Sequence, residues 1–226
     1  AAADDKGEWF ADKLAWRRFW QRMPAEHARN LAFDTCYGIS TASEVPLVEA
    51  GIAADRAVQG NGVYRPLWET EFRAVLRRFR LPLEDFTFVA LGSGKGKLLF
   101  LAADYPFARI VGVEYSPELH AVAQENLRRY RSDRQRCRTL ETVLADAVTH
   151  PLPAGPLICF IFNSFDPPTM GRVMRNLDRE AARRKRGGAP PIRDTEGGAP
   201  RPVRARPPLV RWWRARRVRR GRGRAE

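Results

Sequence analysis

Short apolar runs alternate with segments of helical periodicity between residues 86 and 177. Three runs have the length and the apolar composition of buried strands, residues 86–91, 109–114 and 156–162, and residues 139–144 are a further strand candidate. Three further segments repeat apolar positions at the period of an amphipathic helix: residues 97–105, 116–130 and 169–177. Strands that alternate with helices in this way predict an α/β fold with a doubly wound, mostly parallel sheet.

Two further helices are predicted before the first strand, over residues 8–23 and 68–79. One face of the first helix gathers large apolar side chains: Trp9, Trp16, Trp20 and Met23. We expect this stripe to pack against the core of the domain; a lid over a substrate pocket and an interfacial membrane helix are the alternatives. Residues 31–66 carry scattered glycines without a clear period, so a loop-like connection is predicted there.

The net charge of +14 is concentrated at one end of the chain. Residues 179–226 hold 17 Lys and Arg against 4 Asp and Glu, whereas residues 1–178 hold 23 against 22. Pattern and charge together divide the chain into three parts: an N-terminal helical cap region over residues 1–80, an α/β core over residues 81–178, and a basic tail over residues 179–226.

The basic tail consists mostly of Arg, Pro, Gly and Ala. This composition predicts disorder, because it buries too little apolar surface to offset the entropy of ordering the chain. Two explanations of the tail stay open. A native tail of this kind would be an arm for nucleic acid, and nucleic-acid binding is expected only through it. A frameshift or a readthrough would also produce such an abrupt change of composition where a fifth strand is due.

Three cysteines, Cys36, Cys137 and Cys159, stand at no spacing that suits a metal site, and their odd number argues against a disulfide framework. No metal is therefore expected, and a reducing, cytoplasmic location fits best. The N-terminal residues lack the basic region and continuous apolar core of a signal peptide, and no run reaches the ~18 apolar residues of a membrane span. The oligomeric state is left open.

The stretch that follows the first strand of the core carries the candidate chemistry. Gly92, Gly94 and Gly96 remove three side chains between this strand and the next helix. Glycine lets the chain turn sharply and lets a ligand approach the backbone. A buried strand, a glycine-rich turn and the N-terminus of a helix together form a nucleotide-type site.

Polar residues stand at the carboxyl ends of the other three strands. Glu114 ends the second strand, 22 residues after Gly92, close to the spacing at which dinucleotide folds place a carboxylate on the ribose hydroxyls. Asp146 follows the third strand and Asn163 the fourth, although a single Asp at such a place is more often a turn residue or a helix cap. Because parallel sheets bind ligands beyond the carboxyl ends of their strands, the joint placement predicts one nucleotide-ligand site.

The glycine spacing excludes two nucleotide-binding motifs. The dinucleotide fingerprint G-x-G-x-x-G/A needs its third glycine one residue later, where Lys97 stands. A P-loop, G-x-x-x-x-G-K-[ST], needs glycine in place of Leu91 and Ser or Thr in place of Leu98. The pattern that remains is G-x-G-x-G, followed by an acid at the end of the next strand.

This pattern resembles the class I, Rossmann-like methyltransferases that use S-adenosylmethionine, over about residues 31–178. Four segments carry the resemblance: residues 89–96, 111–114, 145–147 and 161–165. It implies S-adenosylmethionine as the cofactor, held by nine residues: Gly92, Ser93, Gly94, Gly96, Glu114, Tyr115, Asp146, Ala147 and Asn163. More narrowly, the chain is similar to bacterial proteins of unassigned substrate, distantly like the non-SET lysine methyltransferases that act on a histone core.

The resemblance also implies a role for each part of the site. The glycine backbone would face the methionine portion of the cofactor, and Glu114 would accept hydrogen bonds from both ribose hydroxyls. Asp146 would bind the adenine amino group, and Asn163 would border the transferred methyl group. The acceptor is expected near Tyr37, Tyr64 and Phe165. No residue is assigned a catalytic role, because an activated sulfonium needs alignment more than acid–base chemistry.

Two departures from the family pattern bear on activity. Ala90 stands where the family usually has Asp or Glu, so Ala90→Asp is expected to tighten cofactor binding. The last strands of the full fold are missing or replaced by the basic tail. The first hypothesis is therefore a methyltransferase acting on an unidentified small molecule or protein. The alternative is a degenerate or truncated cofactor-binding protein without activity, whose basic tail binds nucleic acid.

Overall fold

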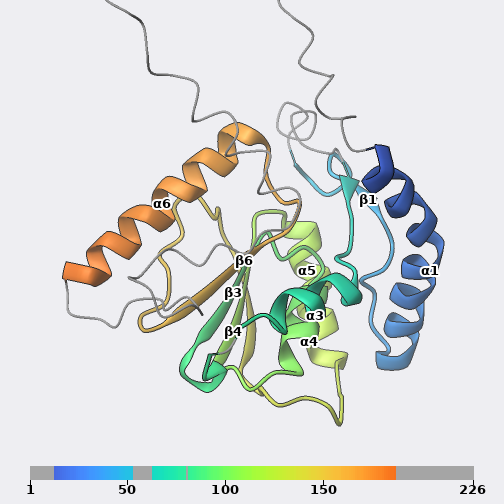
Figure 1. Ribbon diagram of the computed structural model, residues 1–226, viewed down its shortest axis with the longest axis horizontal. Coiled ribbons are helices and arrows are strands. Elements are labelled where there is room, and N and C mark those ends of the chain that lie inside the picture. Colours follow the sequence, from blue (N-terminus) through green and yellow to red (C-terminus); the bar gives the residue numbers. More distant parts are fainter. Residues whose placement is uncertain (1–12, 53–62, 80, 187–226) are drawn as a thin grey trace, which may run out of the picture.

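The computed structural model describes residues 13–52, 63–79 and 81–186. A four-stranded parallel sheet of order β5-β4-β3-β6 lies at its centre (Figure 1). The strands are β3 (Thr87–Leu91), β4 (Arg109–Glu114), β5 (Leu140–Leu144) and β6 (Leu157–Ile161). Counted along the chain, this order is 3-2-1-4, which is how the doubly wound order 3-2-1-4-5-6 begins. The predicted α/β, doubly wound, mostly parallel fold is confirmed, and the described residues hold no fifth parallel strand.

Strand β3 occupies the middle of the sheet because its residues are apolar on both faces. Val89 is in register with Val111 of β4 on one side and with Cys159 of β6 on the other. Phe88 and Ala90 point into one hydrophobic core, and their neighbours Val89 and Leu91 belong to a second core. The alternation of side chains along a strand thus places one core on each face of the sheet.

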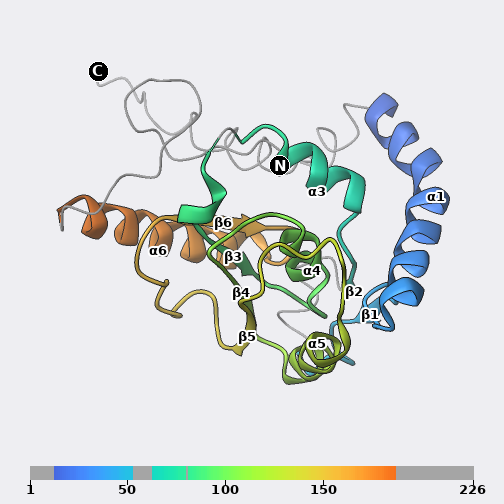
Figure 2. The same ribbon diagram turned by 90° about the horizontal axis from the view of Figure 1, so that it is seen from below.

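Helices cover both faces. α4 (Lys97–Ala103) packs against β3 and β4, and α5 (Pro117–Arg129) packs against β4 and β5. α6 (Pro167–Arg186) lies on the opposite face, where its Val173 is fully buried in the second core (Figure 2). α3 (Glu69–Leu76) adds the buried Phe72 and Leu76 to the first core. The glycine turn is therefore fixed between the central strand and a helix whose seven residues are all buried.

The N-terminal region differs from the prediction in two ways. The described part of its helix, α1 (Lys13–Tyr37), continues past Pro24 well beyond the predicted end at residue 23. The tryptophan stripe was expected to pack on the core, but Trp20 is 58% exposed, so the prediction is wrong for this residue. Trp9 lies outside the described residues, as does the side chain of Trp16.

Residues 31–66, predicted as loop-like, also contain regular structure. Their first seven residues belong to α1, and a small antiparallel sheet joins β1 (Val45–Pro46) to β2 (Val63–Tyr64). Nothing in the apolar pattern of such two-residue strands distinguishes them from a turn.

The C-terminal helix is longer than predicted. α6 runs to Arg186, so residues 179–186, expected to belong to the disordered tail, are helical. Glu180 pairs with Arg183 and Arg184 at spacings of three and four, which supports a helix in this charged sequence. The rest of the tail, residues 187–226, lies outside the described residues. Among the helices that are described, none is long and apolar enough to span a membrane.

Candidate functional site

The glycine turn between β3 and α4 has the backbone that its sequence predicts. Gly92, Gly94 and Gly96 all have positive φ, at 74°, 54° and 90°. A side chain at position 94 would overlap the ring of Tyr64, and one at position 92 would overlap Ser164. Both the left-handed backbone and the close packing therefore require glycine at these positions.

Glu114 is bound directly to this turn. Its Oε2 accepts a hydrogen bond of 2.7 Å from the Gly94 N–H, and its Oε1 accepts one of 2.9 Å from the Ser116 N–H. The side chain is 5% exposed, and burial raises the pKa of the Glu114 carboxyl, although the N–H groups of Ser116, Gly94 and Tyr115 act in the opposite direction. The structure thus brings together the turn and the acid, which are 20 residues apart in sequence.

The end of β5 lies next to Glu114. The Ala145 N–H donates to the Glu114 carbonyl oxygen at 2.9 Å, and Asp146 follows directly. Asp146 Oδ1 accepts from the Val148 N–H at 2.9 Å, which makes Asp146 the first residue of an Asx turn. Ala147 is buried in the second core. The turn role that was weighed for Asp146 is present in the structure, and the adenine role stays a prediction.

The fourth strand contributes through Ser164 as well as Asn163. Asn163 has a positive φ of 50°, rare for a residue with a side chain, at the point where the chain leaves β6. The Ser164 hydroxyl lies within hydrogen-bond distance of the Gly92 carbonyl at 3.2 Å and of the Phe162 carbonyl at 2.8 Å. Sequence reasoning missed Ser164, and its only signal was its position beside Asn163.

Residues 40–43 and 63–64 lie over the glycine turn, and we call them the N-terminal segment. The Tyr64 hydroxyl donates to the Thr41 carbonyl at 3.1 Å, and burial, followed by the charges of Asp34 and Glu114, raises the Tyr64 pKa. Lys95 Nζ donates to the Ser43 carbonyl at 3.0 Å and to its hydroxyl at 2.6 Å. Tyr64, predicted at the acceptor site, is therefore in contact with the turn.

Asn126 of α5 joins the N-terminal segment to the glycine turn through hydrogen bonds. Its Nδ2 donates to the carbonyls of Lys95 and Ser40, at 2.9 and 3.1 Å, and its Oδ1 accepts from the Ser40 N–H at 2.8 Å. All hydrogen-bonding capacity of this 2% exposed amide except one lone pair is used in holding the N-terminal segment to the turn. No motif in the sequence marks Asn126.

The remaining predicted residues are more scattered. Tyr115 follows Glu114 and is 46% exposed. Phe165 packs against the second core. Tyr37 lies among the aromatic rings of Phe33 and Tyr130, with ring centroids 4.7 and 5.0 Å away, so it packs into the first core rather than against the turn. Among the described residues, no cluster of His, Cys, Asp and Glu could hold a metal ion.

Comparison with protein families finds one matching family model, described as a methyltransferase domain, over residues 89–180. This range begins in β3 and includes the glycine turn, Glu114, Asp146 and Asn163. Residues 89–180 are thus similar to a methyltransferase domain, and we refer to them as the methyltransferase domain. The family depends on S-adenosylmethionine, so the predicted cofactor is confirmed for this domain. The narrower likeness to histone lysine methyltransferases stays a prediction.

Solved structures similar to this methyltransferase domain share little sequence with it. An RNA methyltransferase from Salinibacter ruber is 20% identical over 51% of this chain and 69% of its own, with a TM-score of 0.38. CalS10, an amino pentose methyltransferase from Micromonospora echinaspora, is 17% identical over 50% and 46%, also at 0.38. Geranyl diphosphate C-methyltransferase from Streptomyces coelicolor A3(2) is 16% identical over 42% and 34%, at 0.34.

The chain thus spans about a third of the geranyl diphosphate enzyme. With TM-scores below 0.5, these likenesses identify no acceptor for the methyltransferase domain. Comparison with curated proteins finds no match.

Lys97, the first residue of α4, is a buried cation in the methyltransferase domain. It is 2% exposed, and its Nζ lies 4.0 Å from the centre of the Phe33 ring with no hydrogen-bond partner among the described residues. Burial lowers the pKa of Lys97 to about 8, partly offset by the charges of Asp34 and Glu69. The ammonium form is therefore held at a cost near neutral pH.

We expect Lys97→Met to stabilise the protein by about 2 kcal/mol at pH 7, because it removes a buried, unpaired ammonium and keeps a flexible apolar chain beside Phe33. The folded-state pKa of about 8 lies below the ordinary 10.5, so the unfolded state binds more protons. Stability of the wild type therefore rises with pH between these values, and the advantage of Met should shrink by about pH 10.

Urea unfolding from pH 7 to pH 10 measures this difference. Lys95→Met is the matched control: it removes the bonds of Lys95 to Ser43 and should destabilise the protein by about 1 kcal/mol. A loss of stability in Lys97→Met at pH 7 would contradict the assignment of a costly buried charge.

Proposed function

We propose that this chain transfers the methyl group of S-adenosylmethionine to an unidentified acceptor, a small molecule or a protein, in the cytoplasm. One observation carries the proposal: the hydrogen bond between the Gly94 N–H and Glu114 Oε2 joins the glycine turn of β3 to the acid at the end of β4. A turn and a carboxylate at adjacent strand ends are the two parts with which doubly wound folds hold an adenosine ribose. The match of residues 89–180 to a methyltransferase domain supports the same conclusion.

The residues present fit this cofactor. The Glu114 carboxylate accepts hydrogen bonds from the N–H groups of Gly94 and Ser116, and the Tyr115 N–H also stabilises its charge, which leaves acceptor capacity for a ribose hydroxyl. Ser93 Oγ is buried and has no hydrogen-bond partner in the described part of the chain, so a polar ligand group beside it would satisfy it. When bound, S-adenosylmethionine supplies a methyl group already activated on a sulfonium.

The protein's own contribution is orientation and exclusion of water. The turn fixes one end of the site through its short connection to β3, and Tyr64 and Ser43 cover the turn from the N-terminal segment. Alignment of an acceptor against an activated methyl group is the main requirement of an in-line transfer. Asn163, held at a positive φ at the end of β6, is proposed to border the transferred methyl group.

A second candidate is a cofactor-binding protein without activity. Ala90 favours it: this residue is fully buried where the family usually has an acid, so the acid of the family pattern is absent. Under this reading the protein retains affinity for the cofactor, and its basic tail binds nucleic acid.

A thermal-shift panel of S-adenosylmethionine, S-adenosylhomocysteine, NAD and ATP on the full chain tests cofactor choice. The first two should stabilise the fold by about 2.7 kcal/mol at a hundredfold excess over Kd, and the others should not. Labelled methyl transfer to a cell extract then separates the two candidates, because only an enzyme transfers label. Stabilisation by NAD or ATP alone would overturn the proposal.

A further inference from the structure

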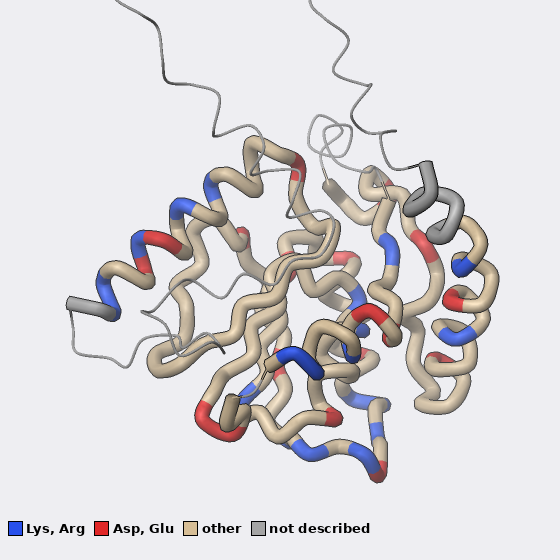
Figure 3. Tube along the Cα trace, in the orientation of Figure 1, with Lys and Arg blue, Asp and Glu red and all other residues tan. Residues whose placement is uncertain are grey.

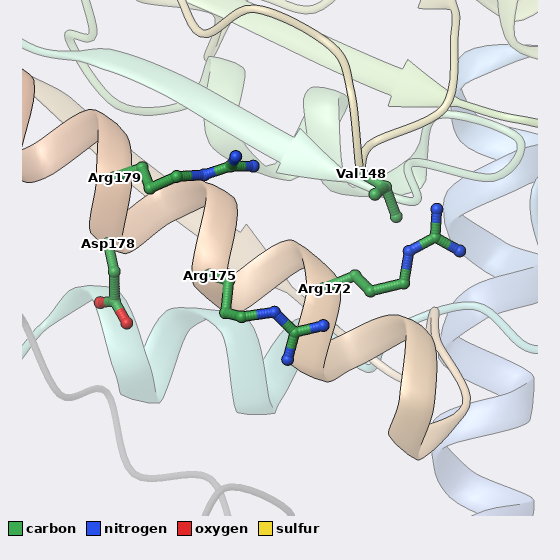
Figure 4. Close-up of a pocket in the computed structure, with 5 residues that line it drawn as sticks. All are labelled: Val148, Arg172, Arg175, Asp178 and Arg179. Atoms are coloured by element: carbon green, nitrogen blue, oxygen red, sulfur yellow. The ribbon is translucent and has the colours of Figure 1, made fainter.

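A hollow on the surface of α6 is lined mostly by arginine. It has a volume of about 480 Å³, and five residues line it: Val148, Arg172, Arg175, Asp178 and Arg179 (Figure 4). Four of them come from the middle of α6, and Val148 comes from the turn after β5. We call this site the arginine hollow. It belongs neither to the glycine turn nor to the basic tail.

The three guanidinium groups of the hollow have no carboxylate partner in the part of the chain that the structure describes. Arg172, Arg175 and Arg179 are exposed, and no ion pair or hydrogen bond joins any of their side chains to another described residue. The acid in the hollow, Asp178, also forms no ion pair with them. The next arginines along the same helix, Arg183 and Arg184, pair with Glu180, in contrast to those of the hollow.

Helix geometry places the three charges in a row. Positions three and four apart share one side of a helix, so residues 172, 175 and 179 follow its axis over about 10 Å. Lys and Arg continue along α6, where only Asp178 and Glu180 are acidic (Figure 3). In Figure 4 the Arg172 side chain reaches toward Val148, which lies two residues after Asp146. The row therefore begins beside the carboxyl ends of the strands.

Unpaired guanidinium groups in a row fit a chain of phosphates. Each guanidinium binds phosphate oxygens through fixed, planar N–H donors, and a row of them matches a repeating anion better than a single one. A membrane surface fits less well, because it needs large apolar side chains next to the basic ones. The exposed large apolar residues of the described chain lie elsewhere: Trp20, Leu31, Val48, Tyr115 and Leu144.

We propose that the arginine hollow binds the sugar-phosphate backbone of a nucleic acid. This binding goes beyond the proposed methyl transfer and does not depend on it, because it uses other residues and needs no cofactor. RNA and DNA share the chemistry that the hollow recognises, so the test includes both.

The test compares two triple variants of the full chain: Arg172→Gln with Arg175→Gln and Arg179→Gln, and Arg128→Gln with Arg129→Gln and Arg131→Gln. The second set lies at the end of α5 and directly after it, and it changes net charge equally. Fluorescence anisotropy measures binding of a single-stranded RNA oligomer and a DNA duplex between about 50 and 200 mM salt. Circular dichroism verifies that both variants are folded.

The hollow variant should lose about ten- to hundredfold in affinity, and the slope of log K against log salt should fall by about 2 to 3, close to one for each phosphate contact. The α5 variant should change the slope by less than about 0.5. Equal changes in both variants would overturn the proposal, because net charge or the basic tail would then explain binding. Whether RNA or DNA shows the larger change identifies the ligand.

Arginine modification by phenylglyoxal, read by mass spectrometry, gives the location of binding. Bound RNA or DNA should protect residues 172, 175 and 179 and leave those of the α5 control reactive. Protection of the hollow by phosphatidylserine vesicles, at equal phosphate concentration and as strong as by nucleic acid, would contradict the proposal in favour of a membrane surface.

Discussion

Replacing Glu114 by alanine is expected to abolish detectable binding of S-adenosylhomocysteine and to cost about 2 to 5 kcal/mol of stability. The substitution removes the acceptor of two buried N–H groups, those of Gly94 and Ser116, and each unsatisfied buried donor costs about 1 to 3 kcal/mol. It also removes the carboxylate proposed to hold the ribose. Calorimetric titration and urea unfolding measure the two effects.

Glu114→Gln separates binding from folding. The amide keeps the shape and one acceptor oxygen, but its NH₂ group faces an N–H where the wild type has an oxygen, so affinity should fall at least about tenfold in a folded protein. Glu141→Ala is the control, because Glu141 is a surface residue paired with Arg109 and its loss should cost less than about 1 kcal/mol. Unchanged affinity in Glu114→Gln would remove Glu114 from the cofactor site.

The difference in stability between the wild type and Glu114→Gln should depend on pH, with a sign that follows from the pKa of Glu114. Because burial raises the pKa of Glu114 in the folded state, the protonated group favours folding at low pH. Its contribution is complete below the ordinary pKa and is lost as pH rises through the raised value. Stability of the wild type relative to Glu114→Gln should therefore fall as pH rises above the ordinary glutamate pKa of about 4.3.

Ala90→Asp is expected to destabilise the fold by about 3 kcal/mol or more at pH 7. The family pattern led us to expect that this substitution tightens cofactor binding, but the structure places the side chain elsewhere. Ala90 is 0% exposed and packs in the same core as Phe88, Phe100 and Leu101. An unpaired carboxylate in such a core is expensive, and it stays ionised only at the cost of folding stability.

The matched control is Ala90→Asn, which has nearly the volume of Asp without its charge. Both variants should be less stable than the wild type, and Asp should be the worse of the two at neutral pH. The gap between them should close toward pH 4, where the aspartate becomes protonated. Equal stability of Ala90→Asp and the wild type would contradict the prediction, because the new carboxylate would then need a partner that the described contacts do not include.

The sheet, the glycine turn and Glu114 were predictable from the sequence, because their signals lie in short stretches of the chain. The central strand β3 and its neighbour β6 are short apolar runs, and such runs are typical of buried strands. The positive φ angles of Gly92, Gly94 and Gly96 need the residue type that stands there. Glu114 was predictable from spacing alone, since parallel strands end at the same edge of a sheet.

The packing of the N-terminal segment over the glycine turn was not predictable, because its contacts join residues far apart in the chain. Asn126 contacts Ser40 across 86 residues, and Lys95 contacts Ser43 across 52. Neither pair has a motif or a period, and polar residues in a stretch rich in glycine are typical of a loop. The length of α6 was missed for another reason: composition predicted disorder from residue 179, while the pairs of Glu180 with Arg183 and Arg184 stabilise a helix locally.

Hydrogen–deuterium exchange of the full chain, with and without saturating S-adenosylhomocysteine, tests the central claim most directly. The claim is that the turn of β3, the end of β4 and the turn after β5 form one cofactor site. It predicts slower exchange in peptides that cover residues 92–97, 114–116 and 145–148, and little change in α6. Absence of protection at the glycine turn, or protection confined to other segments, would contradict it.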